Sequence, residues 1–118
     1  MKKRVTIVGG GTSALFLAAF LNPDIFDVTI FEKKTSLGRK FLVAGDGGFN
    51  LTHSEELESF KLRYTPDSFL DNALDYFSNT ALTTWLLSLG IPTFVGSSGR
   101  VFPEKGIKPI EVLQCIEK

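Results

Sequence analysis

The sequence contains few of the residues that commonly carry covalent or proton-transfer chemistry. Among 118 residues it has one cysteine, Cys115, and one histidine, His53. A single cysteine cannot form an internal disulfide bond, so nothing favours a secreted, disulfide-stapled protein, and we expect a cytoplasmic location. We interpret Cys115 as a plain buried thiol on an amphipathic helix rather than as a nucleophile. We expect no metal site.

Long apolar runs and an excess of one charge are also absent. No stretch approaches the ~20 apolar residues of a membrane span, and a glycine loop next to the first apolar run excludes a signal peptide there. The 13 basic residues are matched by 13 acidic ones, so no nucleic acid partner is expected. With 43% apolar and 22% charged residues, the composition is that of an ordinary globular protein with one modest core.

The first 32 residues instead carry an informative order of elements. A β-branched run, residues 4–8, is followed by Gly9-Gly10-Gly11-Thr12-Ser13-Ala14, then by an apolar helical run, residues 15–21. A second apolar run, residues 28–31, ends at Glu32. This is the G-x-G-x-x-A form of the dinucleotide-binding fingerprint. We therefore predict an α/β fold whose two strands are parallel neighbours in a Rossmann-type unit.

Each part of the fingerprint has a physical role in holding an ADP group. Gly9 lets the chain turn sharply out of the strand, and Gly11 lets the backbone lie against a pyrophosphate. Ala14 keeps the helix close to the strand. Thr12 and Ser13 lie at the helix N-terminus, whose unpaired N–H groups and partial positive charge favour phosphates.

Glu32 lies 21 residues after Gly11, where a carboxylate can accept both hydroxyls of a ribose. An acid at this place disfavours the 2′-phosphate of NADP. A merely structural glycine turn is the alternative to nucleotide binding, and the fingerprint alone does not decide which dinucleotide binds.

The remaining chain is predicted to be a long glycine-rich loop followed by helices and a hairpin. Trp85 is interpreted as a core residue rather than a stacking platform. An irregular loop up to His53 is expected first, followed by a helix at residues 55–64 capped by Ser54 and a helix at residues 67–77 opened by Thr65-Pro66. A third helix is expected at residues 80–89, capped by Ser78 or Asn79 and ended by Gly90. The chain then forms a hairpin of residues 93–95 and 100–102 around Gly96-Ser97-Ser98-Gly99, and a last helix begins at Pro109.

The loop carries a resemblance to a known family. Residues 39–52, R-K-F-L-V-A-G-D-G-G-F-N-L-T, resemble the segment G-R-K-x-L-x-S-G-G-G-R-C-N-L-T. That segment marks bacterial FAD-dependent flavoproteins, often labelled NAD(P)/FAD-dependent oxidoreductases or aminoacetone-oxidase-like enzymes. Residues 69–77, the helix with Trp85, and residues 99–103 also look like that family.

The resemblance implies a glutathione-reductase-type FAD domain, an unknown small-molecule substrate and NAD(P)H as a potential electron donor. Backbone N–H groups of a glycine-rich loop can stabilise negative charge on a reduced flavin. No catalytic acid, base or nucleophile is assigned. The cofactor contacts that it implies are Gly9, Gly11, Thr12, Ser13 and Ala14 at the pyrophosphate, Glu32 and Lys33 at the ribose, Arg39 and Lys40 at phosphates or ribose, and Gly45, Asp46, Gly47, Gly48, Phe49, Asn50 and Leu51 along the flavin.

The departures from the family segment that matter most are at Gly48 and Phe49. These two residues stand where the family has Arg and Cys, so the roles of those two side chains are not carried over.

His53 follows the loop. A flavin-adjacent acid or base is one reading, and a solvent-facing residue at the start of a helix is the one we favour.

Members of this family are several times longer than 118 residues. We expect residues 1–118 to be the N-terminal part of one FAD-binding domain, with the fingerprint and flavin loop in residues 1–53 and a helical segment with a hairpin in residues 54–118. A two-stranded parallel sheet has exposed edges, so these residues alone are expected to bind FAD poorly and to be inactive. The alternatives are the NAD-binding domain of a dehydrogenase, and a noncatalytic nucleotide-binding module that dimerises through the sheet edge.

Overall fold

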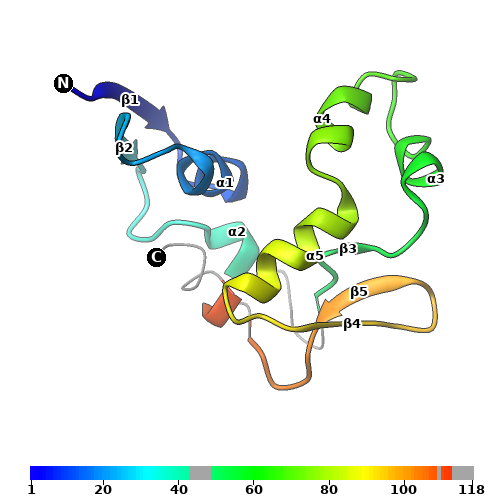
Figure 1. Ribbon diagram of the computed structural model, residues 1–118. Helices are drawn as coiled ribbons and strands as arrows, with labels where there is room; N and C mark the ends of the chain where they lie inside the picture. The colour runs from blue at the N-terminus through cyan, green and yellow to red at the C-terminus, as the bar shows by residue number, and fades with distance from the viewer. Residues whose placement is uncertain (43–48, 109, 113–118) are drawn as a thin grey trace. The chain divides into compact units, whose positions relative to one another are not determined.

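A computed structural model describes residues 1–42, 49–108 and 110–112 (Figure 1). The chain forms two compact units, and each is described by itself. Unit 1 comprises residues 1–46 and 108–118, and unit 2 comprises residues 47–107.

Unit 1 is a β–α–β arrangement. Strand β1 (Lys3–Val8) is followed by helix α1 (Thr12–Phe20), strand β2 (Phe26–Phe31) and the short helix α2 (Arg39–Leu42). The strands pair in parallel, in a register that runs from Lys3 opposite Phe26 to Val8 opposite Phe31. The predicted α/β class and the parallel pairing are confirmed. Helix α2 lies in the segment that the sequence predicted to be irregular.

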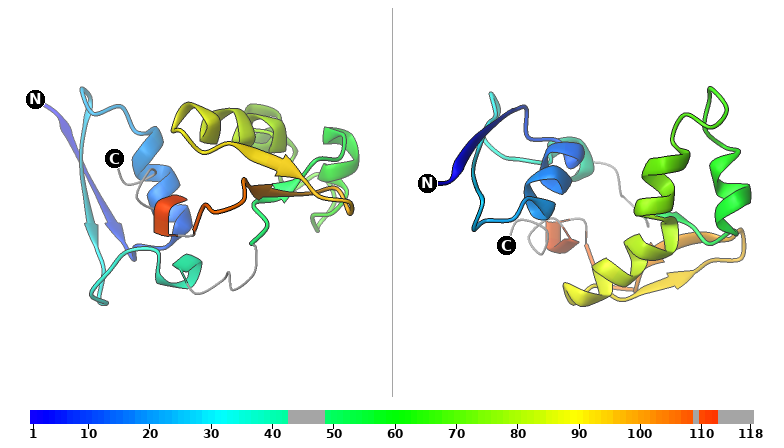
Figure 2. Two further views of the ribbon diagram at one scale, coloured as in Figure 1. Left: turned by 90° about the horizontal axis from the view of Figure 1, so that it is seen from below. Right: turned by 45° about the horizontal axis from the view of Figure 1, so that its top comes forward.

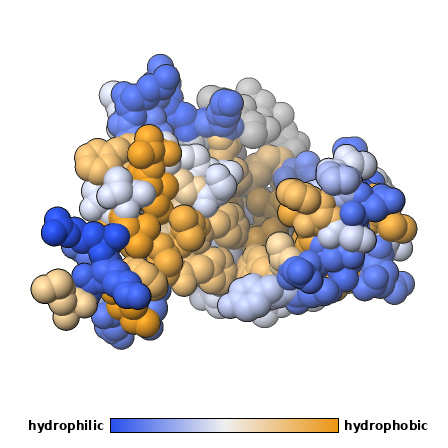
Figure 3. Space-filling view, turned by 90° about the horizontal axis from the view of Figure 1, so that it is seen from above, coloured by the Kyte–Doolittle hydropathy of each residue, from blue (hydrophilic) through white to orange (hydrophobic). Residues whose placement is uncertain are grey.

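The two faces of this sheet differ in burial. Helix α1 lies against one face (Figure 2), and its Ala14 and Leu15 are buried. On the opposite face Val8 and Phe31, which are paired in register, are 86% and 61% exposed. Apolar surface is visible as orange areas at the left of Figure 3, where unit 1 lies. The half-buried strand residues alternate with exposed ones, as a sheet covered on one face requires: Val5, Ile7, Val28 and Ile30.

Unit 2 combines short helices with a small antiparallel sheet. In chain order it contains β3 (Thr52–His53), α3 (Leu57–Lys61), α4 (Asp71–Tyr76), α5 (Asn79–Ser88), β4 (Thr93–Val95) and β5 (Arg100–Pro103). Among the described residues the strand order is β3-β5-β4, so β5 is central. The apolar core of unit 2 includes Phe49, Phe60, Leu86, Ile91 and Val101.

Helix α5 agrees closely with the sequence prediction. The Ser78 hydroxyl accepts a hydrogen bond of 3.0 Å from Ala81 N, which makes Ser78 the N-cap. At the other end Gly90 has φ +86°, and Ile91 N donates to Leu86 O, as in a Schellman motif. Leu86 and Ile91 are each only 2% exposed, so the motif also buries an apolar pair.

The β4–β5 hairpin is likewise confirmed, with the loop at the predicted residues 96–99. Gly96 N donates to Arg100 O over 2.8 Å, and Gly99 has φ +82°. Trp85 is half-buried, with its ring edge-on to Phe77 at a centroid distance of 6.4 Å, in agreement with a packing role.

The two middle helices are shorter than predicted, for different reasons. Helix α3 begins after Glu56, because the Ser54 hydroxyl donates to Gly99 O instead of capping a helix. The helix predicted at residues 67–77 begins only at Asp71, because Ser68 has φ +64° and interrupts helical geometry. None of the helices in the described ranges has the length and hydrophobicity that a membrane crossing needs.

The C-terminal helix is described only in part. Residues 110–112 are helical, and Val112 is 1% exposed. Pro109 and Cys115 lie outside the described residues, so the predictions for these two positions stay predictions.

The neighbours Leu86 and Leu87 test the packing of unit 2, since the first is 2% exposed and the second 61%. Leu86→Ala should lower the free energy of unfolding by about 2–5 kcal/mol through lost burial and a cavity. Leu87→Ala, the matched control, should change it by about 0.5 kcal/mol or less. Urea denaturation of both variants measures the difference, and equal losses would contradict the described core.

Candidate nucleotide-binding site

The glycine loop leaves β1 with the geometry that its first glycine permits. Gly9 has φ +94°, a backbone conformation that favours glycine, and its N–H donates to Phe31 O over 2.7 Å. Gly11 is the N-cap of α1 in extended geometry, and a Cβ added there would meet no atom within 4 Å. The space beside Gly11 is therefore open, as a closely approaching pyrophosphate requires.

Gly10 is fixed more tightly than its neighbours, and sequence reasoning did not single it out. Its N–H donates to Glu32 Oε2 over 2.7 Å, and its carbonyl accepts from Gly38 N over 2.7 Å. A Cβ at this position would overlap with Leu37 Cδ2 and lie 3.2 Å from Glu32 Oε2. Gly10 therefore has a packing reason to be glycine, which the fingerprint pattern treats as a free position.

Glu32 joins the end of β2 to this loop. Besides the bond from Gly10, its Oε1 accepts a hydrogen bond of 3.0 Å from Lys34 N. The N–H groups of Gly10 and, after it, Lys34 hold the pKa of the Glu32 carboxyl below its ordinary value. Each oxygen of an ionised carboxylate has more than one lone pair, so both can still accept from a ribose hydroxyl.

The N-terminus of α1 is open to a ligand. No side chain of the described residues caps it, and Thr12 and Ser13 are exposed. The first N–H groups of a helix lack intrahelical partners and carry partial positive charge, which suits phosphate oxygens. Ala14 is 8% exposed, in keeping with close packing of the helix.

Residues 9–13 and Glu32 line one pocket of about 880 Å³ in unit 1, whereas Ala14 is not among its lining residues. Lys33, Arg39 and Lys40, which the sequence predicted at the site, line it together with Lys34. Four cations against the single carboxylate of Glu32 among the lining residues give the pocket an excess of positive charge. Such an excess favours a ligand with a pyrophosphate group. Lys34, Ser36 and Phe41 were not predicted, since their positions follow from the path of the chain after β2.

The predicted flavin-lining residues are not all described. Gly45, Asp46, Gly47 and Gly48 lie outside the described residues, so their predicted contacts stay predictions.

Phe49, Asn50 and Leu51 belong to unit 2, and their predicted contacts with the flavin also stay predictions. Phe49 is 7% exposed and forms part of the core of unit 2, whereas Asn50 is exposed. Phe49 thus has a packing role where the family segment has cysteine.

The favoured reading of His53, a solvent-facing residue that starts a helix, is wrong. His53 is a half-buried residue of β3, and both of its ring nitrogens have hydrogen-bond partners. The strand was missed because a pair of residues between a glycine-rich loop and an acidic run carries no local strand pattern.

The lowered pKa of Glu32 predicts a pH-dependent contribution to stability. Above pH 4.5, Glu32→Gln should lower the free energy of unfolding by its full amount, because the wild-type carboxylate is ionised in both the folded and the unfolded state. The difference in free energy of unfolding between variant and wild type should vanish as the pH falls through the lowered native pKa of Glu32. Urea midpoints of both proteins from pH 7 to pH 3 measure this. Glu104→Gln, at an exposed position, is the control, and a difference for Glu32→Gln that is constant with pH would refute the role.

Comparison with known proteins places this geometry in a family. The family described as "HI0933-like protein Rossmann domain" matches residues 3–118. The chain is 31% identical to the ribosomal RNA dihydrouridine synthase of Haemophilus influenzae over 104 residues, which are 88% of this chain and 26% of that protein. It is 29% identical to the 3-dehydro-bile acid delta(4,6)-reductase of Clostridium scindens over 116 residues, 97% of this chain and 28% of that protein.

The chain therefore spans about a quarter of the length of these relatives. The family match covers both units, including the β–α–β arrangement and the glycine loop that the structure describes. This chain belongs to the HI0933-like Rossmann domain family.

Proposed function

We propose that the protein to which this chain belongs is an FAD-dependent oxidoreductase, and that unit 1 holds the ADP part of FAD. The observation that carries the proposal is one pocket that joins residues 9–13, Glu32, Arg39 and Lys40. An open helix N-terminus, a space beside a glycine and a carboxylate at the end of the next strand are the parts that an ADP group needs.

The residues divide the work according to their chemistry. The N–H groups of Thr12 and Ser13 face the pyrophosphate, and Arg39 and Lys40 neutralise its charge. Glu32 accepts from the adenosine ribose while it keeps the loop in place through Gly10. Lys33 flanks the ribose. When bound, the flavin supplies the electron transfer, and these residues bind and orient it.

The resemblance of residues 39–52 to a flavoprotein segment supports FAD over NAD, because an NAD-binding domain needs no flavin-lining segment after the second strand. The NAD-binding domain of a dehydrogenase remains the first alternative. The second is a noncatalytic module that pairs with a second copy through a strand edge. A native product that ends at Lys118 would favour the module.

The open face of unit 1 supports a longer protein. Val8 and Phe31 expose apolar surface on a parallel sheet, a kind of sheet that is normally covered on both faces. Since the chain spans about a quarter of the length of its relatives, we propose that further segments of a longer chain cover this face of the sheet. We further propose a cytoplasmic enzyme with NAD(P)H as electron donor.

The names of the two relatives suggest a substrate class. Dihydrouridine differs from uridine by a saturated carbon–carbon bond, and that bond in uridine is conjugated to a ring carbonyl. A delta(4,6)-reductase that acts on a 3-dehydro compound likewise reduces double bonds conjugated to a ketone. We propose that this protein reduces a carbon–carbon double bond conjugated to a carbonyl, by addition of two electrons and two protons. The substrate that we propose is a small molecule.

Gly10 and Gly11 offer a matched pair of alanine substitutions. Gly11→Ala should leave stability unchanged and weaken FAD binding at least about tenfold, because the methyl group fills the space for a pyrophosphate. Gly10→Ala should lower the free energy of unfolding by about 1 kcal/mol, because its Cβ overlaps with Leu37 Cδ2 and this side chain must shift. FAD titration and urea denaturation measure the two effects, with Ser97→Ala as an exposed control.

The cofactor itself is tested on the native protein. A visible band near ~450 nm, typical of flavins and absent from nicotinamides, is expected in the wild-type protein. The FAD proposal fails if the native protein shows no such band and does not bind added FAD.

The substrate class is tested by oxidation of NAD(P)H under anaerobic conditions. Cyclohex-2-en-1-one should be reduced at least about tenfold faster than cyclohexanone or cyclohexene, because only the enone has a double bond activated by conjugation and able to accept hydride. Equal rates with all three compounds, or reduction of cyclohexanone alone, would contradict the proposal.

A further inference from the structure

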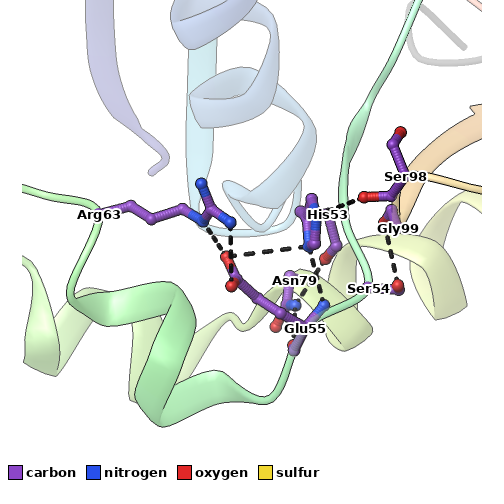
Figure 4. A network of polar contacts seen from close by, with 7 residues as sticks. All are labelled: His53, Ser54, Glu55, Arg63, Asn79, Ser98 and Gly99. Atoms are coloured by element: carbon purple, nitrogen blue, oxygen red, sulfur yellow. Dashed lines mark hydrogen bonds and ion pairs between the residues drawn. The ribbon is translucent and has the colours of Figure 1, made fainter.

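Residues 51–54, which begin at the last predicted flavin contact, are bonded to the β4–β5 hairpin, and Figure 4 shows the bonds of His53 and Ser54. Leu51 N donates to Val101 O over 2.7 Å, and strand β3 then pairs with β5. The backbone N–H and the hydroxyl of Ser54 both donate to Gly99 O, at 2.8 and 2.9 Å. The register of this segment is therefore fixed by bonds to residues more than 40 positions away in the sequence.

His53 contributes a side-chain link to the same hairpin. Its Nε2 lies 3.1 Å from Ser98 O, and its Nδ1 lies 3.1 Å from the backbone N–H of Glu55. Because one partner only accepts and the other only donates, the ring carries its proton on Nε2. A Cβ at Gly99 would lie 2.7 Å from His53 Cε1, so glycine is required there for the ring to reach the loop.

Asn79, the first residue of α5, ties the segment from the other side. It is 5% exposed, and its Nδ2 donates to His53 O over 2.7 Å and to Glu55 O over 2.9 Å. Both partners are carbonyl oxygens, which sets the orientation of the amide. Both side-chain N–H groups of Asn79 therefore donate to the segment that follows the predicted flavin loop.

Glu55 completes the network through its side chain. Its carboxylate pairs with Arg63, with Oε2 3.1 Å from Nη2, and its Oε1 lies 3.8 Å from His53 Nδ1. The hydrogen bond from Arg63 holds the pKa of the Glu55 carboxyl below its ordinary value. The backbone of Glu55, bound by Asn79, is thereby anchored by its side chain as well.

Two segments that resemble the flavoprotein family therefore meet in unit 2, where residues 51 and 52 pair with Val101 in the segment of residues 99–103. We propose that Asn79, His53 and Ser54 are positioning residues that hold Asn50 and Leu51 in the conformation that contacts the flavin. This rests on the proposed function and on the prediction that Asn50 and Leu51 touch the flavin. Neither Asn79 nor His53 is a catalytic residue in this proposal, since each acts through the backbone of residues 51–55.

Asn79→Ala in the native protein tests the proposal, because it removes both amide bonds. We expect the dissociation constant for FAD to rise about tenfold, the order expected from two lost buried hydrogen bonds, and the visible absorption band of the bound flavin to change in position or shape. Ser88→Ala is the control on the same helix, because the Ser88 hydroxyl donates only to Trp85 O within α5, and it should leave both readouts unchanged.

A milder variant covers a failure of Asn79→Ala to fold. Ser54→Ala removes the hydroxyl bond to Gly99 O and keeps the backbone bond, so it should fold and bind FAD a few-fold more weakly, with an altered flavin band. If a folded Asn79→Ala variant or Ser54→Ala has only a lowered urea midpoint, and keeps the wild-type affinity for FAD and the wild-type flavin spectrum, the positioning role is overturned. The FAD proposal would still stand in that case. A wild-type protein without affinity for FAD would overturn both.

Discussion

The hydrogen bond between the Glu32 carboxylate and Gly10 N–H is the constraint on which the candidate site depends. It joins the ends of two parallel strands, and with the bond from Gly38 N to Gly10 O it fixes the backbone on both sides of one residue. A carboxylate in this place satisfies N–H groups that would otherwise lack partners, and still has lone pairs for a ribose. A side chain at Gly10 would displace Leu37, whose Cδ2 overlaps with the position of an added Cβ, whereas Gly11 opens onto free space.

In unit 2, contacts with other elements likewise hold a short segment in place, namely the residues that follow Asn50. Ordering the backbone of a short segment costs conformational entropy, so such a segment must be held by contacts with other elements. Here the segment after Asn50 is held by backbone pairing with β5, by the His53 ring and by the buried amide of Asn79. All of these contacts lie within unit 2, so the segment is ordered by its own unit.

The sequence predicted elements whose signals are local. Strands β1 and β2, helix α1, and helix α5 with its Ser78 cap and Gly90 end follow from patterns within a few residues. Predictions failed where a distant partner decides the structure. Ser54 donates to Gly99 O rather than capping a helix, and the two-residue strand β3 exists only because β5 lies beside it. The positive φ of Ser68 shortened a predicted helix, and such a conformation is uncommon for serine. Within the site, Gly10 was missed because its constraint comes from Leu37 and Glu32, which tertiary structure brings close.

Hydrogen–deuterium exchange of the native protein, with and without FAD, tests the central claim most directly, because it reports on individual backbone segments. An ADP group bound as proposed lies against residues 9–13 and against lining residues between Glu32 and Lys40. FAD should slow exchange in peptides from both segments, whereas a peptide of the exposed hairpin loop, residues 96–99, should exchange at an unchanged rate. Unchanged exchange at residues 9–14, under conditions where FAD is bound, would contradict the assignment of this loop as the cofactor site.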